Sequence, residues 1–327
     1  MAEGGAAAAG ARDRGGLRRN SAARRPGRQS CCSLRLDGIS VGSINSRFRA
    51  KPEREDPCPL LTNVGASFLG SKIYGQGFLL EPDEAGTILK SDLRNAERIK
   101  QYIGGDEVNS SPTQTPERFV IDFGELELAQ ASAWPALVEL VRERVKPERD
   151  GMGDSAAGKL LKQHWWQFFR VRRELYAAIA PLTRCLVNSQ VSKHLIFAFQ
   201  PTDRVFSQKL NVFPLEGYAP FAILQSRIHN AWTWLLSSTM KSDLSYSASD
   251  CFENFPFPAE DPRAVIPALE QIGEQLYSAR AAFMIETEQG LTKTYNALKD
   301  PHCTDPRILA LRTQHEQMDA AVLAAYG

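Results

Sequence analysis

The sequence predicts an α+β fold, in which small β elements mix with long helices and a C-terminal pair of helices follows. Short apolar runs broken by Gly and Pro occupy residues 34–123, which indicates strands rather than long helices. From Val265 to Phe283, apolar residues recur at spacings of 4, 3, 4, 3 and 4, which is typical of one helical stripe. Residues 1–33 are rich in Arg and Gly and nearly free of large apolar side chains, so we expect a disordered leader. A targeting sequence and a nucleic-acid-binding arm are the alternatives for this leader.

Order is expected to begin near Leu34, with a strand where Ile39 and Val41 alternate with small polar residues. The apolar, Gly-rich stretch 66–80 predicts a β-hairpin or bulged strands. The remaining elements of this half are expected in chain order: a helix from Asp83 or Glu84 to Arg98, a loop over 109–115, a strand over 118–123, and a helix from Trp134-Pro135.

The second half is expected to be mainly helical. Its elements should be a flexible break over 151–158, one long helix from Lys159 to Ala180 ended by Pro181, strands at Leu195–Phe199 and Val205–Val212, and a helix over 219–238. The stripe at 265–283 is followed by a second one from Ile308 to Val322, capped by Asp305 and Pro306. The two stripes can cover each other as an antiparallel pair of helices.

Charge is distributed unevenly along the chain. The net charge of all 327 residues is only +1, but residues 159–211 hold nine Lys and Arg against two acids. The stretches before and after this one, 29–158 and 212–327, carry net charges of −5 and −6. A basic stretch inside a foldable region indicates a nucleic-acid partner.

The motifs of the common catalytic classes are missing. The six Cys form no CxxC pair, and no Glu-x-Lys pair, Walker loop or Gly-x-Ser-x-Gly motif occurs. Asn254-Phe255-Pro256-Phe257 has Phe where an adenine-methylating loop needs its first Pro, so we interpret it as structural. His229 lies on an apolar helix and is interpreted as a core residue. We therefore predict no catalytic, cofactor-binding or metal-binding residue.

Two groups of residues are candidates for contact with DNA. Aromatic residues alternate with cations at 162–176. One interpretation is an amphipathic helix, whose aromatic residues lie in the core and whose cations face solvent. The other is that the cations form a face that binds DNA phosphates. The predicted backbone contacts are Lys162, Arg170, Arg172, Arg173 and Lys193. The polar segments 188–194 and 203–211 are either ordinary surface loops or base-reading elements, because their side chains match the donors and acceptors of base edges. The predicted base-reading residues are Ser189, Gln190, Asp203, Arg204, Gln208, Lys209 and Asn211.

Several segments, in order, resemble the C-terminal part of the MmeI-like and Eco57I-like type II restriction-modification DNA (adenine-N6) methyltransferases of bacteria. They are SFLGSKIYGQGF (67–78), YIGGDEV (102–108), RFVIDF (118–123), Trp165-Trp166, SRIHNAWTW (226–234), CFENFPFP (251–258) and LTKTYNAL (291–298) with the last residues to 327. The resemblance implies a connector over 34–118, a DNA target recognition domain over 119–258 and a helical element over 259–327. It also implies a cytoplasmic defence protein that binds double-stranded DNA, with no membrane partner.

In that family the S-adenosylmethionine site and the adenine-binding loop precede this region. We therefore expect a fragment whose methyltransferase domain is missing, with no cofactor bound by the chain itself. One alternative is a separate non-catalytic specificity subunit, which would act with a methylase in trans rather than in cis. The other is an intact enzyme of an unrelated type, which the lack of any catalytic constellation disfavours.

Overall fold

The computed structural model describes residues 34–45, 50, 57–240 and 243–327, in two units divided after Glu55. In the first unit, strands β1 (Leu34–Leu36) and β2 (Ile39–Val41) form an antiparallel hairpin. Asp37 and Gly38 have φ angles of 50° and 80°, the left-handed values that a tight two-residue hairpin turn needs. The predicted strand at 39–41 is confirmed, whereas the leader lies outside the described residues.

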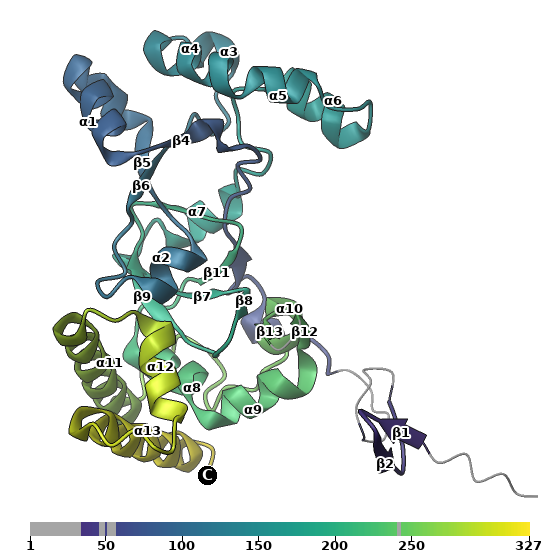
Figure 1. The fold of residues 1–327 in the computed structure, drawn as a ribbon, viewed down its shortest axis with the longest axis vertical. Helices are drawn as coiled ribbons and strands as arrows, with labels where there is room; N and C mark the ends of the chain where they lie inside the picture. The colour runs from purple at the N-terminus through teal and green to yellow at the C-terminus, as the bar shows by residue number, and fades with distance from the viewer. Residues whose placement is uncertain (1–33, 46–49, 51–56, 241–242) are drawn as a thin grey trace, which may run out of the picture. The chain divides into compact units, whose positions relative to one another are not determined.

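In the second unit, the described strands form three small sheets (Figure 1). Their orders are β10-β5-β6-β4, β3-β11-β7-β9 and β12-β13-β8, and every pair is antiparallel except β5 with β10. The strands are β3 (Phe68–Leu69), β4 (Leu79–Leu80), β5 (Ile99–Ile103), β6 (Arg118–Ile121), β7 (Arg184–Ser189), β8 (Val191–Ser192), β9 (Ala198–Pro201), β10 (Val205–Phe206), β11 (Leu210–Phe213), β12 (Ser238–Met240) and β13 (Asp243–Ser245).

Helices lie at both ends of this unit, with the sheets between them (Figure 1). The α-helices are α1 (Pro82–Ser91), α2 (Gly105–Ser110), α3 (Leu128–Ala131), α4 (Pro135–Arg144), α5 (Lys146–Asp150), α6 (Ala156–Gln163), α7 (Arg173–Ile179), α8 (Tyr218–Gln225), α9 (Arg227–Leu236), α10 (Ala248–Cys251), α11 (Pro267–Thr287), α12 (Leu291–Lys299) and α13 (Pro306–Ala325). Within the described residues, none of these helices is both long and apolar enough to span a bilayer.

Several elements differ from the prediction. The stretch 66–80 is not a hairpin, because β3 pairs with β11 and β4 pairs with β6 in a different sheet. The strand predicted over Val205–Val212 is two strands, and the one predicted at Leu195–Phe199 begins only at Ala198. The helix expected over 219–238 breaks at Ser226, whose side chain caps the second half by accepting from the His229 amide.

Two further differences are at helix ends. The helix predicted to reach Arg98 ends at Ser91, and a 3-10 helix (Leu93–Glu97) continues it. Helix α2 covers the first two residues of the predicted 109–115 loop.

The C-terminal helical pair is confirmed. The Arg307 guanidinium at the start of α13 lies 3.3 Å from the Glu286 carboxylate near the end of α11, so the helices run antiparallel. Alternate turns of both helices supply buried side chains to one apolar cluster: Leu269, Leu276, Phe283, Ile308, Leu311, Met318 and Val322. Helix α8 packs against the same face of α11, so the pair is part of a larger helical core. Val265 lies outside the helix and is exposed.

Candidate nucleic-acid interface

The basic stretch is not the single helix that its pattern predicted. Helix α6 ends at Gln163 and α7 begins at Arg173, and the residues between them run irregularly. The Trp166 indole and the Gln167 amide both donate to the Leu126 carbonyl, at 2.8 and 2.9 Å. Trp165, Trp166 and Phe168 are all buried in one apolar cluster, although a straight helix would spread them around its circumference. Burial of these aromatics therefore takes precedence over helix continuity.

Arg149 in α5 fixes the course of this irregular segment. Its guanidinium is fully buried and donates to the carbonyls of His164 (3.0 Å), Gln167 (2.7 Å) and Ile73 (3.0 Å). It also lies 3.3 Å from the Tyr74 carbonyl, and burial lowers the pKa of Arg149 to about 10. One side chain thus ties two segments together that are about ninety residues apart in the sequence.

The two segments also meet through their backbones. Lys72 N donates to Arg170 O at 3.0 Å, and Arg170 N donates to Lys72 O at 3.1 Å. The Lys72 ammonium and the Arg170 guanidinium lie 5.4 and 4.8 Å from the centre of the Phe169 ring. Arg172 has a left-handed φ of 64° and its Nε lies 3.4 Å from the Gly70 carbonyl. Three cations therefore stand on adjoining pieces of backbone.

The turn between β10 and β11 lies directly against the same segment. Ser71 N donates to Phe206 O at 2.7 Å, and a Cβ added to Gly70 would lie only 2.1 Å from Ser207 O. Only glycine allows so close an approach of two backbones. The exposed residues of this turn are Gln208 and Lys209, which follow Ser207.

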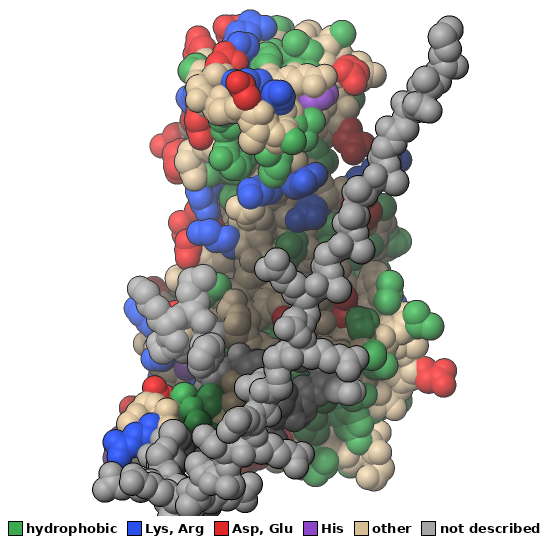
Figure 2. Space-filling model, turned by 90° about the vertical axis from the view of Figure 1, so that its right-hand side faces the viewer, with side chains coloured by type: hydrophobic (Ala, Val, Ile, Leu, Met, Phe, Trp, Pro, Cys, Tyr) green, Lys and Arg blue, Asp and Glu red, His purple; other side chains and the backbone are tan. Residues whose placement is uncertain are grey.

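A second turn, after β7, joins the first. Gln190 N donates to Lys209 O at 2.9 Å, and the Gln190 side-chain amide donates to Gln208 O at 2.6 Å. We call the surface formed by Lys72, Arg170, Arg172, Gln190, Gln208 and Lys209 the basic strip. Figure 2 shows Lys and Arg side chains gathered below the helices α3–α6.

The cations of the basic strip have no counterion among the residues that the structure describes. Among the described residues, none of Lys72, Arg170, Arg172 and Lys209 forms an ion pair with a carboxylate. By contrast, Lys162 lies 3.5 Å from Asp154 and Arg173 lies 3.8 Å from Glu125. Unpaired cations of one sign on adjoining segments produce a positive potential, which is the arrangement that attracts an anionic polymer.

The structure places the other predicted base-reading residues differently. Ser189, Arg204 and Asn211 are buried, so the segments 188–194 and 203–211 are not uniformly exposed loops as the sequence suggested. Asn211 donates to the Asn188 side chain at 2.8 Å, and the Arg204 guanidinium donates to the Gln200 side chain at 3.0 Å.

Asn109 donates to the Ser189 hydroxyl at 2.8 Å, so Ser189 too is satisfied inside the protein. Asp203 is exposed but lies beside Arg204, outside the basic strip. Lys193 is exposed after β8, in a turn of its own. The DNA roles of these residues stay predictions. Of the predicted base-reading residues, the geometry favours Gln190, Gln208 and Lys209, because they lie on the basic strip.

Sequence reasoning missed Lys72 and Arg149. Lys72 lies in a segment that the resemblance singled out, yet its partner Arg170 is about a hundred residues away and no local pattern joins them. Arg149 follows an ordinary charged run, and its burial depends wholly on tertiary contacts.

The two structural interpretations are confirmed. The Asn254 side chain accepts from the Trp232 indole at 3.1 Å and donates to the Asp250 carbonyl at 2.8 Å, inside the protein. His229 is fully buried beside the Tyr246 hydroxyl, at 3.1 Å, and burial lowers its pKa to about 3. In the part of the chain that the structure describes, no group of His, Cys, Asp and Glu could hold a metal ion.

Known proteins share this architecture. Residues 58–259 match the sequence model of the family described as "MmeI, target recognition domain". DNA methyltransferase A of Bacillus subtilis (strain 168) is 28% identical over 195 residues, which are 57% of this chain and 20% of that protein. The solved structure of MmeI, a type IIL restriction-modification enzyme in complex with DNA, superposes with a TM-score of 0.61 at 18% identity. That match covers 88% of this chain and 37% of the MmeI chain.

The chain thus spans about a fifth of the length of the curated relative and well under half of the solved one. The family model begins at Cys58 and so includes residues that the sequence analysis assigned to a connector. Because that model covers more than half of its residues, the chain belongs to the MmeI target recognition domain family.

Proposed function

We propose that this chain recognises duplex DNA as the specificity module of an S-adenosylmethionine-dependent N6-adenine DNA methyltransferase, in restriction-modification or phage defence. One observation carries the proposal: four cations, none of them paired with an acid in the described part of the chain, stand on three segments that are joined by backbone hydrogen bonds. Membership of the MmeI target recognition domain family supports it. The solved MmeI relative was determined in complex with DNA, which adds support.

Two kinds of contact follow from the geometry. We assign Lys72, Arg170 and Arg172 to phosphate contacts that set the register of the protein on the duplex, because each of these cations already lies against the Phe169 ring or the Gly70 carbonyl. Gln190, Gln208 and Lys209 suit base reading, because glutamine pairs with adenine and lysine with guanine in the major groove. Their two turns are hydrogen-bonded to each other, so the three side chains start from a fixed backbone.

Methylation itself belongs to a methyltransferase domain that works with this module, in cis or in trans. We propose that S-adenosylmethionine binds there and not to this chain. The purified chain should then transfer no tritiated methyl group to mixed-sequence DNA, and should restore transfer when it is joined or added to a methylase domain. Restoration on simple mixing would favour the trans arrangement. Methyl transfer by the chain alone would overturn this assignment.

The DNA-binding test compares two residues of the basic strip across salt concentrations. Arg170→Met should weaken binding to every duplex and lower the slope of log K against log salt by about one unit. Lys209→Met should cost about 1–3 kcal/mol on the target sequence and little elsewhere, once the target has been mapped from methylated adenines. Lys90→Met, an exposed lysine on α1, is the matched control. Wild-type affinity of both strip variants on all duplexes would refute the proposal.

A further inference from the structure

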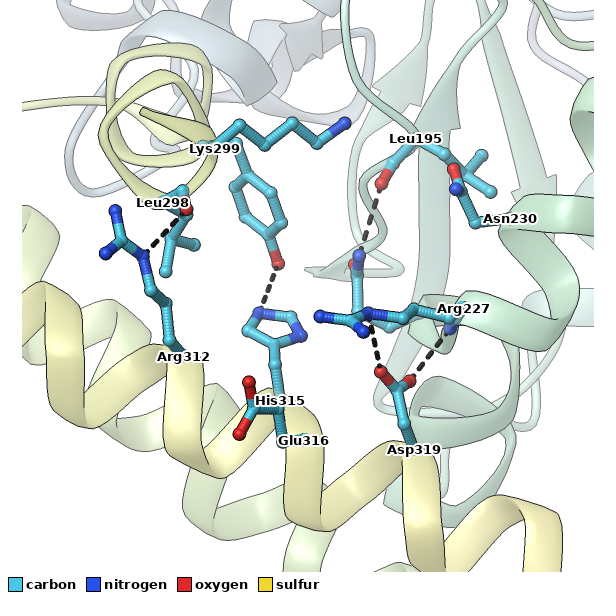
Figure 3. Close-up of a pocket in the computed structure, with 11 residues that line it drawn as sticks. Leu195, Arg227, Asn230, Leu298, Lys299, Arg312, His315, Glu316 and Asp319 are labelled. Carbon is cyan, nitrogen blue, oxygen red and sulfur yellow. Dashed lines mark hydrogen bonds and ion pairs between the residues drawn. The ribbon is translucent and has the colours of Figure 1, made fainter. Parts of the chain in front are cut away.

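A cavity with both apolar and polar lining residues opens in the helical part of the second unit, where α9, α12 and α13 meet. Its volume is about 200 Å³, and its lining residues come from all three helices and from the segment at Leu195 (Figure 3). Typical sites for drug-sized ligands measure ~300–1,000 Å³, so this cavity suits a smaller molecule.

The donors that face the cavity have few partners. The Lys299 ammonium and the Asn230 side-chain amide make no hydrogen bond or ion pair with any residue that the structure describes. The Lys299 side chain extends from α12, and Asn230 on α9 lies near Leu195 (Figure 3). Arg312, in contrast, is occupied, because its guanidinium donates to the Leu298 and Ala297 carbonyls at the end of α12, at 2.9 and 3.0 Å.

The charged side chains that line the cavity have a small excess of cations: Arg227, Lys299 and Arg312 against Glu316 and Asp319. Burial, together with the nearby Arg280 and Arg227 cations, lowers the pKa of His315 to about 4. Burial and the Lys193 ammonium likewise lower the pKa of Lys299. Cations thus crowd this site from three directions: the end of α12, the start of α9 and the buried core behind it.

A hydrogen-bond chain orients the neutral His315 ring. The buried Arg280 guanidinium donates to the Tyr295 hydroxyl at 3.1 Å, and that hydroxyl lies 3.3 Å from His315 Nε2. We assign the Tyr295 hydroxyl as the donor to Nε2, which places the ring proton of the neutral imidazole on Nδ1. His315 therefore offers a further N–H donor.

Neither of the two acids on the cavity wall, Glu316 and Asp319, pairs with Lys299. Asp319 is engaged with Arg227, whose Nε lies 3.2 Å from its carboxylate and whose backbone N–H donates to it at 2.8 Å. Glu316 is exposed and lies on the far side of His315 from Lys299 (Figure 3). Lys299 forms no ion pair with any acid that the structure describes, whereas Arg227 shares its charge with Asp319.

We propose that this cavity binds the oxyanion of a phosphate group, with Lys299, Asn230 and Arg227 as donors. A phosphate offers several strong acceptor oxygens, which match a ring of N–H donors better than a single carboxylate does. The group can come from a small phosphate compound in solution or from a DNA strand that passes the exposed rim at Lys299 and Lys193. The first source is independent of the proposed DNA recognition.

The test measures binding of inorganic phosphate to the full chain by calorimetry, at constant ionic strength set with chloride. Lys299→Met removes one charged donor and should weaken phosphate binding about tenfold. Asn230→Asp keeps the shape of the side chain but replaces its donor by a negative charge, so it should abolish binding. Lys293→Met, an exposed lysine on the same helix outside the cavity, should change nothing. The nitrogen chemical shifts of His315 should move on titration in the wild type.

A parallel arm measures duplex binding across salt concentrations with the same variants. Phosphate binding that Lys299→Met weakens, with an unchanged salt slope for DNA, supports a small phosphate compound as the ligand. A salt slope lowered by about one unit in Lys299→Met, without binding of free phosphate, supports a strand phosphate. The proposal is overturned if phosphate leaves His315 unmoved and Lys299→Met alters neither measurement, or if Lys293→Met has the same effect as Lys299→Met.

Discussion

Replacement of Arg149 by Met tests how the basic strip is held in place. Methionine fills much of the same space but donates no hydrogen bond, so the carbonyls of His164, Gln167 and Ile73 lose their buried donor. A hydrogen bond to a charged group contributes about 1.5–3 kcal/mol, and part of the loss is offset because no cation is desolvated any longer. The expected cost is therefore about 3–5 kcal/mol of unfolding free energy.

The assay is thermal unfolding followed by DNA binding below the transition. At roughly 2–4 °C per kcal/mol for a chain of this size, the melting temperature should fall by about 10 °C. Folded Arg149→Met should also bind duplex DNA more weakly, since Lys72 and Arg170 no longer have a fixed backbone. Arg142→Met is the control, because Arg142 is half exposed and should change stability by under about 0.5 kcal/mol. An unchanged melting temperature would show that water can replace the guanidinium. It would refute the claim that Arg149 holds the basic strip in place.

Three further predictions concern stability and close packing. His229 should make the fold acid-sensitive: with a folded pKa of about 3 against ~6.5 unfolded, stability falls as pH drops below ~6.5, by about 2 kcal/mol at pH 5. His229→Gln should reduce that difference between pH 7 and pH 5, and an unchanged pH dependence would contradict this. Gly70→Ala should displace the Ser207 turn and weaken DNA binding, whereas Gly86→Ala, which meets nothing within 4 Å, should not; equal affinities would contradict the close approach. Leu269→Asp should destabilise by about 3–5 kcal/mol in chemical denaturation, and an unaltered midpoint would mean that this face is exposed.

The elements that could be predicted from the sequence are those with strong local patterns. The stripes of α11 and α13 carry their apolar residues at helical spacing, which predicts that both helices bury one face. Likewise, Asp305 and Pro306 mark the start of α13 by local chemistry, and the structure shows the Asp305 side chain accepting from the Arg307 amide.

The basic region was harder to predict, because its conformation is decided by distant residues. Over residues 164–172, helical periodicity favours a continuous helix, whereas burial of the aromatic residues favours an irregular backbone. The contacts of Arg149 and Leu126 with this segment show that the irregular backbone forms. The polar residues near β7 and β11 pose a similar problem, since Asn211 and Gln208 look alike in composition. One is hydrogen-bonded in the interior and the other is exposed, a distinction that depends on strand register.

The parallel pairing of β5 with β10 has a consequence for synthesis of the protein. Tyr102 and Ile103 find their partners Val205 and Phe206 only after about a hundred more residues have been made. A nascent chain that ends before β10 therefore leaves one edge of β5 open, and an open strand edge invites pairing with other chains. Closure of so long a loop is also a slow, late event in folding. Competence for DNA binding should thus arise in one step, once Phe206 has been made and reaches Ser71, and not gradually as the chain emerges from the ribosome.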